Sequence, residues 1–115
     1  FFQNTILQVA APRGLQNAIS ASISSTFNTS NEAPLILEFD GNETTERNLG
    51  DRTKYIISGS FVLKSASNTV LWSSQRLMKF GISANPAAAK QAAYAEFDKD
   101  IRFFIVPQIV RNLGY

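Results

Sequence analysis

Hydrophobic and polar residues alternate most regularly between Thr53 and Phe80, and this stretch predicts a long β-hairpin. Its first strand carries an apolar residue at almost every second position on one face: Tyr55, Ile57, Phe61 and Leu63. Polar side chains occupy the other face (Ser58, Ser60, Lys64), which is the pattern of a half-buried antiparallel strand. The segment Ser65–Thr69 predicts the turn. The return strand then runs from Val70-Leu71-Trp72 through Leu77-Met78-Lys79-Phe80.

The first half of the chain predicts two shorter strands around a helix. Thr5–Ala10 predicts a strand that ends before Pro12. From Gly14 to Asn28 apolar residues recur at the spacing of an amphipathic helix: Leu15, Ala18, Ile19, Ile23 and Phe27. Leu35–Asp40 alternates again and predicts a second strand. The polar, glycine-containing segment 41–52 predicts a mobile connection with extended ends.

A second helix is predicted from Pro86, with Asn85 as its N-cap and an alanine-rich first half. Its predicted apolar stripe contains Tyr94, Phe97, Ile101, Phe104 and Ile105. Phe103 and Val106 fall beside that stripe and are interpreted either as additional core or as an exposed patch for a partner. Pro107 should kink or end the helix, because it lacks the donor for a regular helical hydrogen bond.

These elements follow one another as β-α-β-β-β-α. They predict a single α+β domain over residues 1–115, with an antiparallel sheet of about four strands and two helices on one face. A continuous four-stranded meander with another strand order is the alternative. A chain of 115 residues is long enough to enclose one hydrophobic core.

Composition narrows the possible functions. The chain has no cysteine and no histidine, and its net charge is +2. Residues 1–53 carry three arginines against six carboxylates, whereas residues 54–115 carry eight lysines or arginines against three carboxylates. The basic second half could meet an anionic partner or membrane surface, or it could simply be a solvated face. The small net charge gives no reason to expect nucleic-acid binding.

No catalytic arrangement is evident. Glu38 and Asp40 share a strand face, as solvated polar positions ordinarily do, and Asp98 and Asp100 are two residues apart on a helix and so do not face each other. The serines have no histidine to act as a base, and the glycines form no phosphate-binding loop. We therefore expect no enzymatic activity, no cofactor and no catalytic metal.

The order of motifs resembles a known family. Leu35-Ile36-Leu37-Glu38-Phe39, a polar stretch and then Tyr55–Leu63 resemble the auxiliary lipoproteins of bacterial ABC-type (MCE or Pqi-like) lipid transport systems. Val70-Leu71 through Phe80 fills the second half of that family's hairpin, and the helix from Pro86 follows as it does there. The chain departs from the family in its short connection at Pro12–Gly14.

This resemblance implies a non-enzymatic domain in the periplasm, associated with the outer membrane through a lipid anchor upstream of this chain. Its partners would be protein components of an envelope lipid transporter, and possibly lipid. Within that hypothesis, the partner-binding residues are predicted to be Trp72, Phe103 and Val106, although simple core packing is the competing interpretation of Trp72.

Two alternatives remain open. The chain also resembles the lipopolysaccharide-assembly lipoproteins, which would imply binding to an outer-membrane barrel and to anionic lipid through Lys64, Arg76 and Lys79. Two N-x-S/T sites, at Asn28 and Asn42, leave open a secreted interaction domain.

Overall fold

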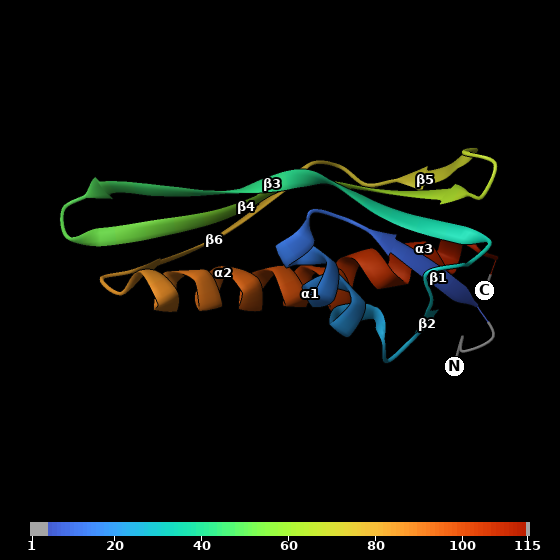
Figure 1. Ribbon diagram of the computed structural model, residues 1–115, viewed down its shortest axis with the longest axis horizontal. Helices are drawn as coiled ribbons and strands as arrows, with labels where there is room; N and C mark the ends of the chain where they lie inside the picture. The colour runs from blue at the N-terminus through green and yellow to red at the C-terminus, as the bar shows by residue number, and fades with distance from the viewer. Residues whose placement is uncertain (1–4, 115) are drawn as a thin grey trace.

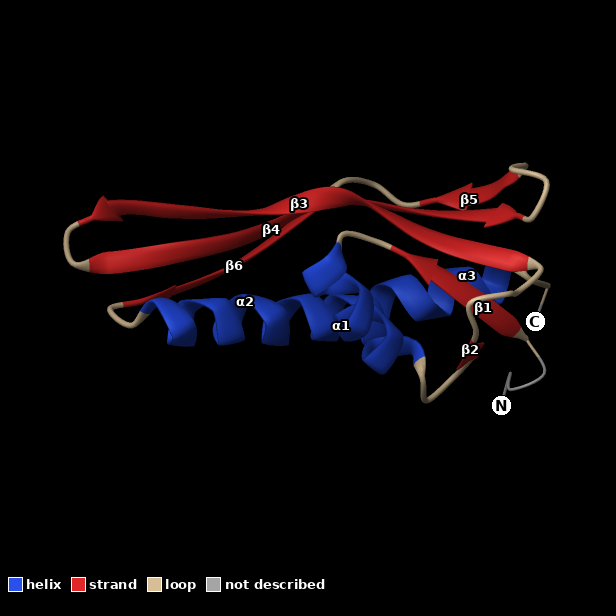
Figure 2. Ribbon diagram, viewed as in Figure 1, coloured by secondary structure: helices blue, strands red, loops and turns tan. Residues whose placement is uncertain are grey.

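The computed structural model describes residues 5–114, and only the backbone of residues 48 and 49. Within this range a six-stranded sheet is covered on one face by helices (Figures 1 and 2). The strands are β1 (Ile6–Ala10), β2 (Asn28–Thr29), β3 (Leu35–Leu49), β4 (Arg52–Ser65), β5 (Val70–Ser73) and β6 (Leu77–Ser83). The helices are α1 (Arg13–Ile23), α2 (Pro86–Asp100), the π-helical turn η1 (Ile101–Ile105) and α3 (Val106–Asn112). The predicted α+β class is confirmed.

The sheet is mixed rather than purely antiparallel. Its order is β2-β1-β3-β4-β5, and β6 also pairs with β4. Strand β1 lies parallel to both β2 and β3, while β4 is antiparallel to β3, β5 and β6. The parallel pairing follows from α1, because a helix between two strands returns the chain to the end of the sheet from which it started.

The predicted connection at residues 41–52 is wrong for most of its length, because β3 continues to Leu49 and β4 begins at Arg52. Thr44 lies opposite Ile56, and Glu46 lies opposite the oppositely charged Lys54. Such cross-strand pairs stabilise a sheet even where the strand itself is polar. The polar composition of this segment therefore did not predict a strand, because the strand is stabilised by its pairing with β4.

Glycine is required where β3 and β4 pass the middle of the sheet. Gly41 and Gly59 lie directly opposite each other, beside the ring of Phe39. A Cβ atom at Gly41 would lie 2.2 Å from the Ser58 carbonyl oxygen, and one at Gly59 would lie 2.4 Å from the Asp40 carbonyl oxygen. Because both obstacles are backbone atoms, a larger residue at either position would push the two strands apart.

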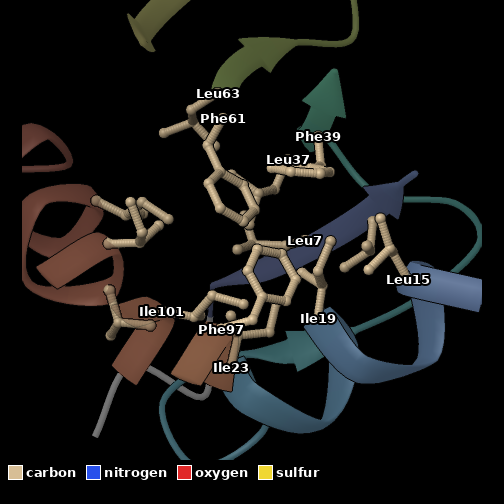
Figure 3. Close-up of a cluster of buried hydrophobic side chains, with 14 of the residues drawn as sticks. Leu7, Leu15, Ile19, Ile23, Leu37, Phe39, Phe61, Leu63, Phe97 and Ile101 are labelled. Carbon is tan, nitrogen blue, oxygen red and sulfur yellow. The ribbon is translucent and has the colours of Figure 1, made fainter. Parts of the chain in front are cut away.

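The core lies between the sheet and the helices, and its centre is aromatic. The ring of Phe39 lies 4.8 Å from that of Phe61 and 5.2 Å from that of Phe97. Figure 3 shows Phe61 from β4 and Phe97 from α2 pointing toward each other. Helix α1 adds its predicted apolar residues to this core: Leu15, Ile19 and Ile23. This helix ends at Ile23, earlier than predicted.

The second helix begins as predicted. The Asn85 side chain accepts a hydrogen bond of 2.9 Å from the Ala87 N–H, and Pro86 occupies the first turn. Helix α2 then packs against β6 at Gly81, where an added Cβ would lie 2.3 Å from the Ala89 carbonyl oxygen and 2.6 Å from the Ala92 side chain. Only glycine on the strand and alanine on the helix allow so close an approach.

Replacing Gly81 with Ala should destabilise the domain, because the Ala89 carbonyl belongs to the helix backbone and cannot rotate away. Overpacking of this kind costs about 1–3 kcal/mol of unfolding free energy. Chemical denaturation followed by circular dichroism measures the change. Met78→Ala, on the exposed face of the same strand, is the control and should change the unfolding free energy by no more than about 0.5 kcal/mol. A Gly81→Ala protein as stable as the control would contradict the packing of α2 on β6.

Candidate functional site

The edge of the sheet is interrupted between β5 and β6. Both strands pair with β4, but residues 74–76 between them do not continue the ladder. Ser74 fills the gap: its N–H donates to the Phe61 carbonyl oxygen at 2.8 Å, and its Oγ accepts from the Phe61 N–H, also at 2.8 Å. The Ser74 hydroxyl thus takes the place of the backbone carbonyl that would accept from the Phe61 N–H in a continuous strand. The backbone of residues 75 and 76 is then free to leave the sheet.

The helical segment opposite this break is also irregular. In η1 the backbone bonds run five residues back, and the Val106 N–H donates to the Ile101 carbonyl. In a regular α-helix Phe104 follows Ile101 on the buried face, three residues later. The wider π turn adds one residue before the chain returns to the buried face. Ile105 is therefore buried, and Phe104 is 61% exposed. The prediction that Phe104 belongs to the core stripe is therefore wrong.

The position of the π turn is explained by Pro107. In a regular helix the ring of this proline would clash with the carbonyl of Phe103 and leave it without a donor. The wide turn immediately before it changes that spacing, and the helical backbone continues through α3 to Asn112. The predicted irregularity at Pro107 is confirmed, although the helix does not end there. The displaced register also buries Val106, which is only 7% exposed.

A cleft of about 450 Å³ lies between the strand break and the π turn. Leu77 and Ile105 give it an apolar lining, and Phe104 forms part of its wall. Its polar lining includes Gln75, Arg76 and Gln108. Asp100 also lines the cleft, but its carboxylate already pairs with Lys79 at 3.3 Å. Within residues 5–114 no carboxylate forms an ion pair with Arg76, whose only hydrogen bond is a 3.4 Å contact to the Ser58 hydroxyl.

The three predicted partner-binding residues do not form one surface. Trp72 lies opposite Leu63 in the sheet and packs, half-buried, against the core. Phe103 is 68% exposed on η1, next to Phe104 of the cleft, whereas Val106 is in the core. The role in partner binding that the sequence assigned to these residues stays a prediction.

The three predicted lipid-binding cations are also separated. Lys64 pairs with Glu38 at 3.2 Å on the open face of the sheet. Lys79 lies opposite the buried Ile57 and therefore points toward the helices, where it pairs with Asp100. Arg76 remains as the cation without a carboxylate partner in the described range, and it is the one that lines the cleft. Any shared role of the three in binding lipid is likewise untested.

Three of the four candidate carboxylates have local partners: Glu38, Asp98 and Asp100. Asp98 accepts a hydrogen bond of 2.6 Å from the Ser22 hydroxyl of α1 and pairs with Arg102 at 2.9 Å. The Ser22 hydrogen bond, followed by Arg102, holds the pKa of Asp98 below its ordinary value despite partial burial. Among residues 5–114, no group of three or more metal-binding side chains gathers at one place.

A polar cluster between the sheet and the helices was not predicted from the sequence. Glu43 on β3 accepts hydrogen bonds from the hydroxyls of Tyr55, at 2.6 Å, and Tyr94. Tyr94 also donates to the Gly14 carbonyl at 3.4 Å, which connects α2 to the start of α1. Burial, and then the Glu43 carboxylate, raises the pKa of Tyr55 to about 12 and that of Tyr94 further. The signal was available, since Glu43 has the same parity as the core residues Leu37 and Phe39.

Comparison with known proteins identifies the fold. No protein-family model and no curated protein matches the sequence. A Xanthomonas campestris protein of the DUF330 family superposes with a TM-score of 0.72, over 96% of this chain and 88% of its own, at 10% identity. A minor lipoprotein from Acinetobacter baumannii gives 0.64, over 85% and 87% of the two chains, at 9% identity. A Caulobacter crescentus protein assigned as a lipoprotein gives 0.60, over 90% of each chain, at 15% identity.

At these identities the likeness establishes the fold alone. The expected similarity to bacterial lipoproteins is confirmed at that level, and the shared part is most of each chain. In the described range, no helix combines the length and the apolar composition needed to cross a membrane.

The register of the π turn can be tested by truncating two neighbouring residues. Ile105→Ala should lower the unfolding free energy by about 2–5 kcal/mol, because it removes a buried side chain from the core. Phe104→Ala should change it by about 0.5 kcal/mol or less, because that ring is exposed. Denaturant titration of the two variants measures both effects. Similar losses for the two variants would indicate a regular α-helix in place of η1, because both residues would then follow Ile101 on the buried face.

Alkaline pH should destabilise the domain through the Glu43 cluster. Below pH 10, the ordinary pKa of tyrosine, both hydroxyls are protonated in the folded and the unfolded chain. Above it the unfolded tyrosines release protons that the folded Tyr55 keeps until about pH 12, so the unfolded state gains stability as the pH rises. The unfolding free energy should therefore fall over this interval. It should fall less in a Tyr55→Phe/Tyr94→Phe protein, and equal slopes for the two proteins would contradict this assignment.

Proposed function

We propose that this chain is a non-enzymatic domain of a bacterial envelope lipoprotein, which binds protein components of an ABC-type (MCE) lipid transporter on the periplasmic side of the outer membrane. The observation that carries the proposal is the extent of the fold likeness. It covers 85–96% of this chain and 87–90% of the similar structures, two of which are called lipoproteins. A whole domain, rather than a common substructure, is shared.

The arrangement of the family-like segments supports the more specific transport role. The segments Leu35–Phe39 and Tyr55–Leu63, on which the resemblance to the transport lipoproteins rests, lie side by side in β3 and β4. The helix that follows the hairpin packs back on this same sheet (Figure 1). The residues of the resemblance thus belong to one structural unit, which also carries the cleft at its edge.

The geometry gives less support to lipopolysaccharide assembly. That alternative requires Lys64, Arg76 and Lys79 to present positive charge together. Two of them are neutralised by Glu38 and Asp100, and Lys79 points to the opposite face of the sheet. We therefore prefer docking of protein partners at the cleft.

Cross-linking and affinity purification of the tagged full-length lipoprotein from its own host tests the proposed function. Mass spectrometry should find the periplasmic proteins of an MCE-type transporter enriched over an unrelated tagged lipoprotein. A Phe104→Ser protein should retain markedly less of them, because truncating an aromatic anchor costs about 2 kcal/mol or more of binding free energy. Recovery of a large outer-membrane barrel in place of transporter proteins would overturn the proposal and favour lipopolysaccharide assembly.

A further inference from the structure

The free edge of β6 lacks the usual protection of a sheet edge. Within residues 5–114 this strand pairs only with β4, in a register without a bulge. It contains no proline, and its only charged side chain, Lys79, points toward the helices and pairs with Asp100. Charges, prolines, bulges or a covering element ordinarily protect an edge against pairing with another chain. On the open face of the sheet β6 instead presents apolar side chains that are 41–56% exposed: Met78, Phe80 and Ile82.

The backbone groups of these three residues point away from β4. Phe61 of β4 exchanges two hydrogen bonds with Ser74, on the side of the strand where β5 and β6 lie. Backbone groups alternate between the two sides of a strand, and residues 54–65 of β4 keep an unbroken register with β3. The odd-numbered residues of β4 therefore bond to β6, and their partners in β6 are odd-numbered as well. The N–H and C=O groups of the three exposed residues are left on the free edge. Within residues 5–114 none of these N–H groups has an acceptor.

The order of side chains in β6 is complementary to a second copy of itself. When two copies run antiparallel with Phe80 opposite Phe80, Met78 of each copy lies opposite Ile82 of the other. The exposed apolar side chains then form one row on the open face. On the other face Lys79 lies opposite Gly81, which has no side chain. A register centred on Lys79 would place two lysines opposite each other, which is destabilising. The register centred on Phe80 therefore satisfies both the free backbone groups and the exposed apolar side chains.

Helix α2 leaves this edge accessible. Tyr94 of α2 reaches toward α1, where its hydroxyl donates to the Gly14 carbonyl at 3.4 Å. Ala92 lies on nearly the opposite side of α2, because two residues correspond to a rotation of about 200°. It is exposed although it lies beside Gly81 of β6. The helix thus presents a small side chain on the side of the free edge, where a second copy can approach.

The opposite edge of the sheet favours a closed pair over a growing sheet. That edge is formed by β2, which has only two residues. A head-to-tail contact between β6 and β2 would satisfy few of the free backbone groups. Pairing β6 with β6 uses the same surface on both copies and leaves no free β6 edge for a third.

We propose that two copies of this chain associate by antiparallel pairing of their β6 strands about a two-fold axis at Phe80. The pairing joins the two sheets into one continuous sheet. Because it covers only a short strand and one row of side chains, the dimer dissociates on dilution. This association goes beyond the proposed function and does not rest on it, since it requires no transporter protein.

Sedimentation equilibrium over about a hundredfold range of protein concentration tests the association. The apparent mass should rise with concentration from 12.7 kDa toward twice that value. Phe80→Lys should weaken the association by about tenfold or more, because two like charges would meet on the axis and an aromatic contact would be lost. Leu71→Lys, at a similarly exposed position on β5, is the control and should leave the association constant unchanged. Circular dichroism should show that both variants are folded, since both side chains are exposed.

The chain has no cysteine, so single introduced cysteines can report the register. A Met78→Cys protein mixed with an Ile82→Cys protein should form a disulfide on mild oxidation. Opposite residues of a hydrogen-bonded antiparallel pair have Cα atoms about 5.5 Å apart, which a disulfide can bridge. Either protein alone should give little cross-linked dimer, because the two copies of one such residue lie about 13 Å apart along the strands.

The outcomes separate this proposal from its alternatives. A monomer at every concentration, or equal weakening by Phe80→Lys and Leu71→Lys, would overturn it. Disulfides that form as readily in each cysteine variant alone as in the mixture would overturn the register centred on Phe80. If the purified chain stays monomeric and Met78→Cys instead cross-links to another envelope protein, the edge serves a different partner and self-pairing is overturned. A dimer that pairs as described but retains no transporter protein would support this inference while the proposed function fails.

Discussion

The pairing of β3 with β4 is the constraint on which the rest of the structure depends. Its thirteen registered pairs run the full length of a molecule 48 Å long. Strand β1 joins one side of this pair, β5 and β6 join the other, and the helices cover a single face of it. Because side chains alternate along a strand, this one register decides which residues reach the core. It directs Glu43 and Tyr55 inward and Lys64 outward.

The space between the sheet and the helices is filled by residues of very different size along its length. Near the start of α2 the helix backbone lies against Gly81, and alanines complete the contact. At the centre the rings of Phe39, Phe61 and Phe97 separate the layers. The Glu43 cluster lies between sheet and helix as well, where hydrogen bonds to two tyrosines satisfy a carboxylate on the core-facing side. Small residues therefore set how closely α2 approaches one end of the sheet, and large ones set its spacing at the centre.

Local signals predicted the parts of the fold that depend on local physics. The alternation of apolar and polar residues predicted the strand at Tyr55–Leu63. Asn85 as an N-cap, followed by Pro86, predicted the start of α2. The second half of β3 was missed because its stability comes from cross-strand partners such as Lys54 opposite Glu46, which no local composition reveals. The candidate site was predicted only in part. Arg76 and Phe103 were singled out, but the exposure of Phe104 depends on a π turn, and a search for helical periodicity assumes that no such turn exists.

The use of Ser74 as a substitute for a backbone carbonyl has a consequence for how such a domain can diverge. Because the side chain closes the hydrogen-bonding pattern of β4, the strands on either side of residues 74–76 keep their registers independently. Residues added to or removed from this short link would lengthen or shorten one wall of the cleft without moving a core residue. Related domains can therefore differ in the shape of this cleft through insertion and deletion here, while the hydrophobic interior stays the same.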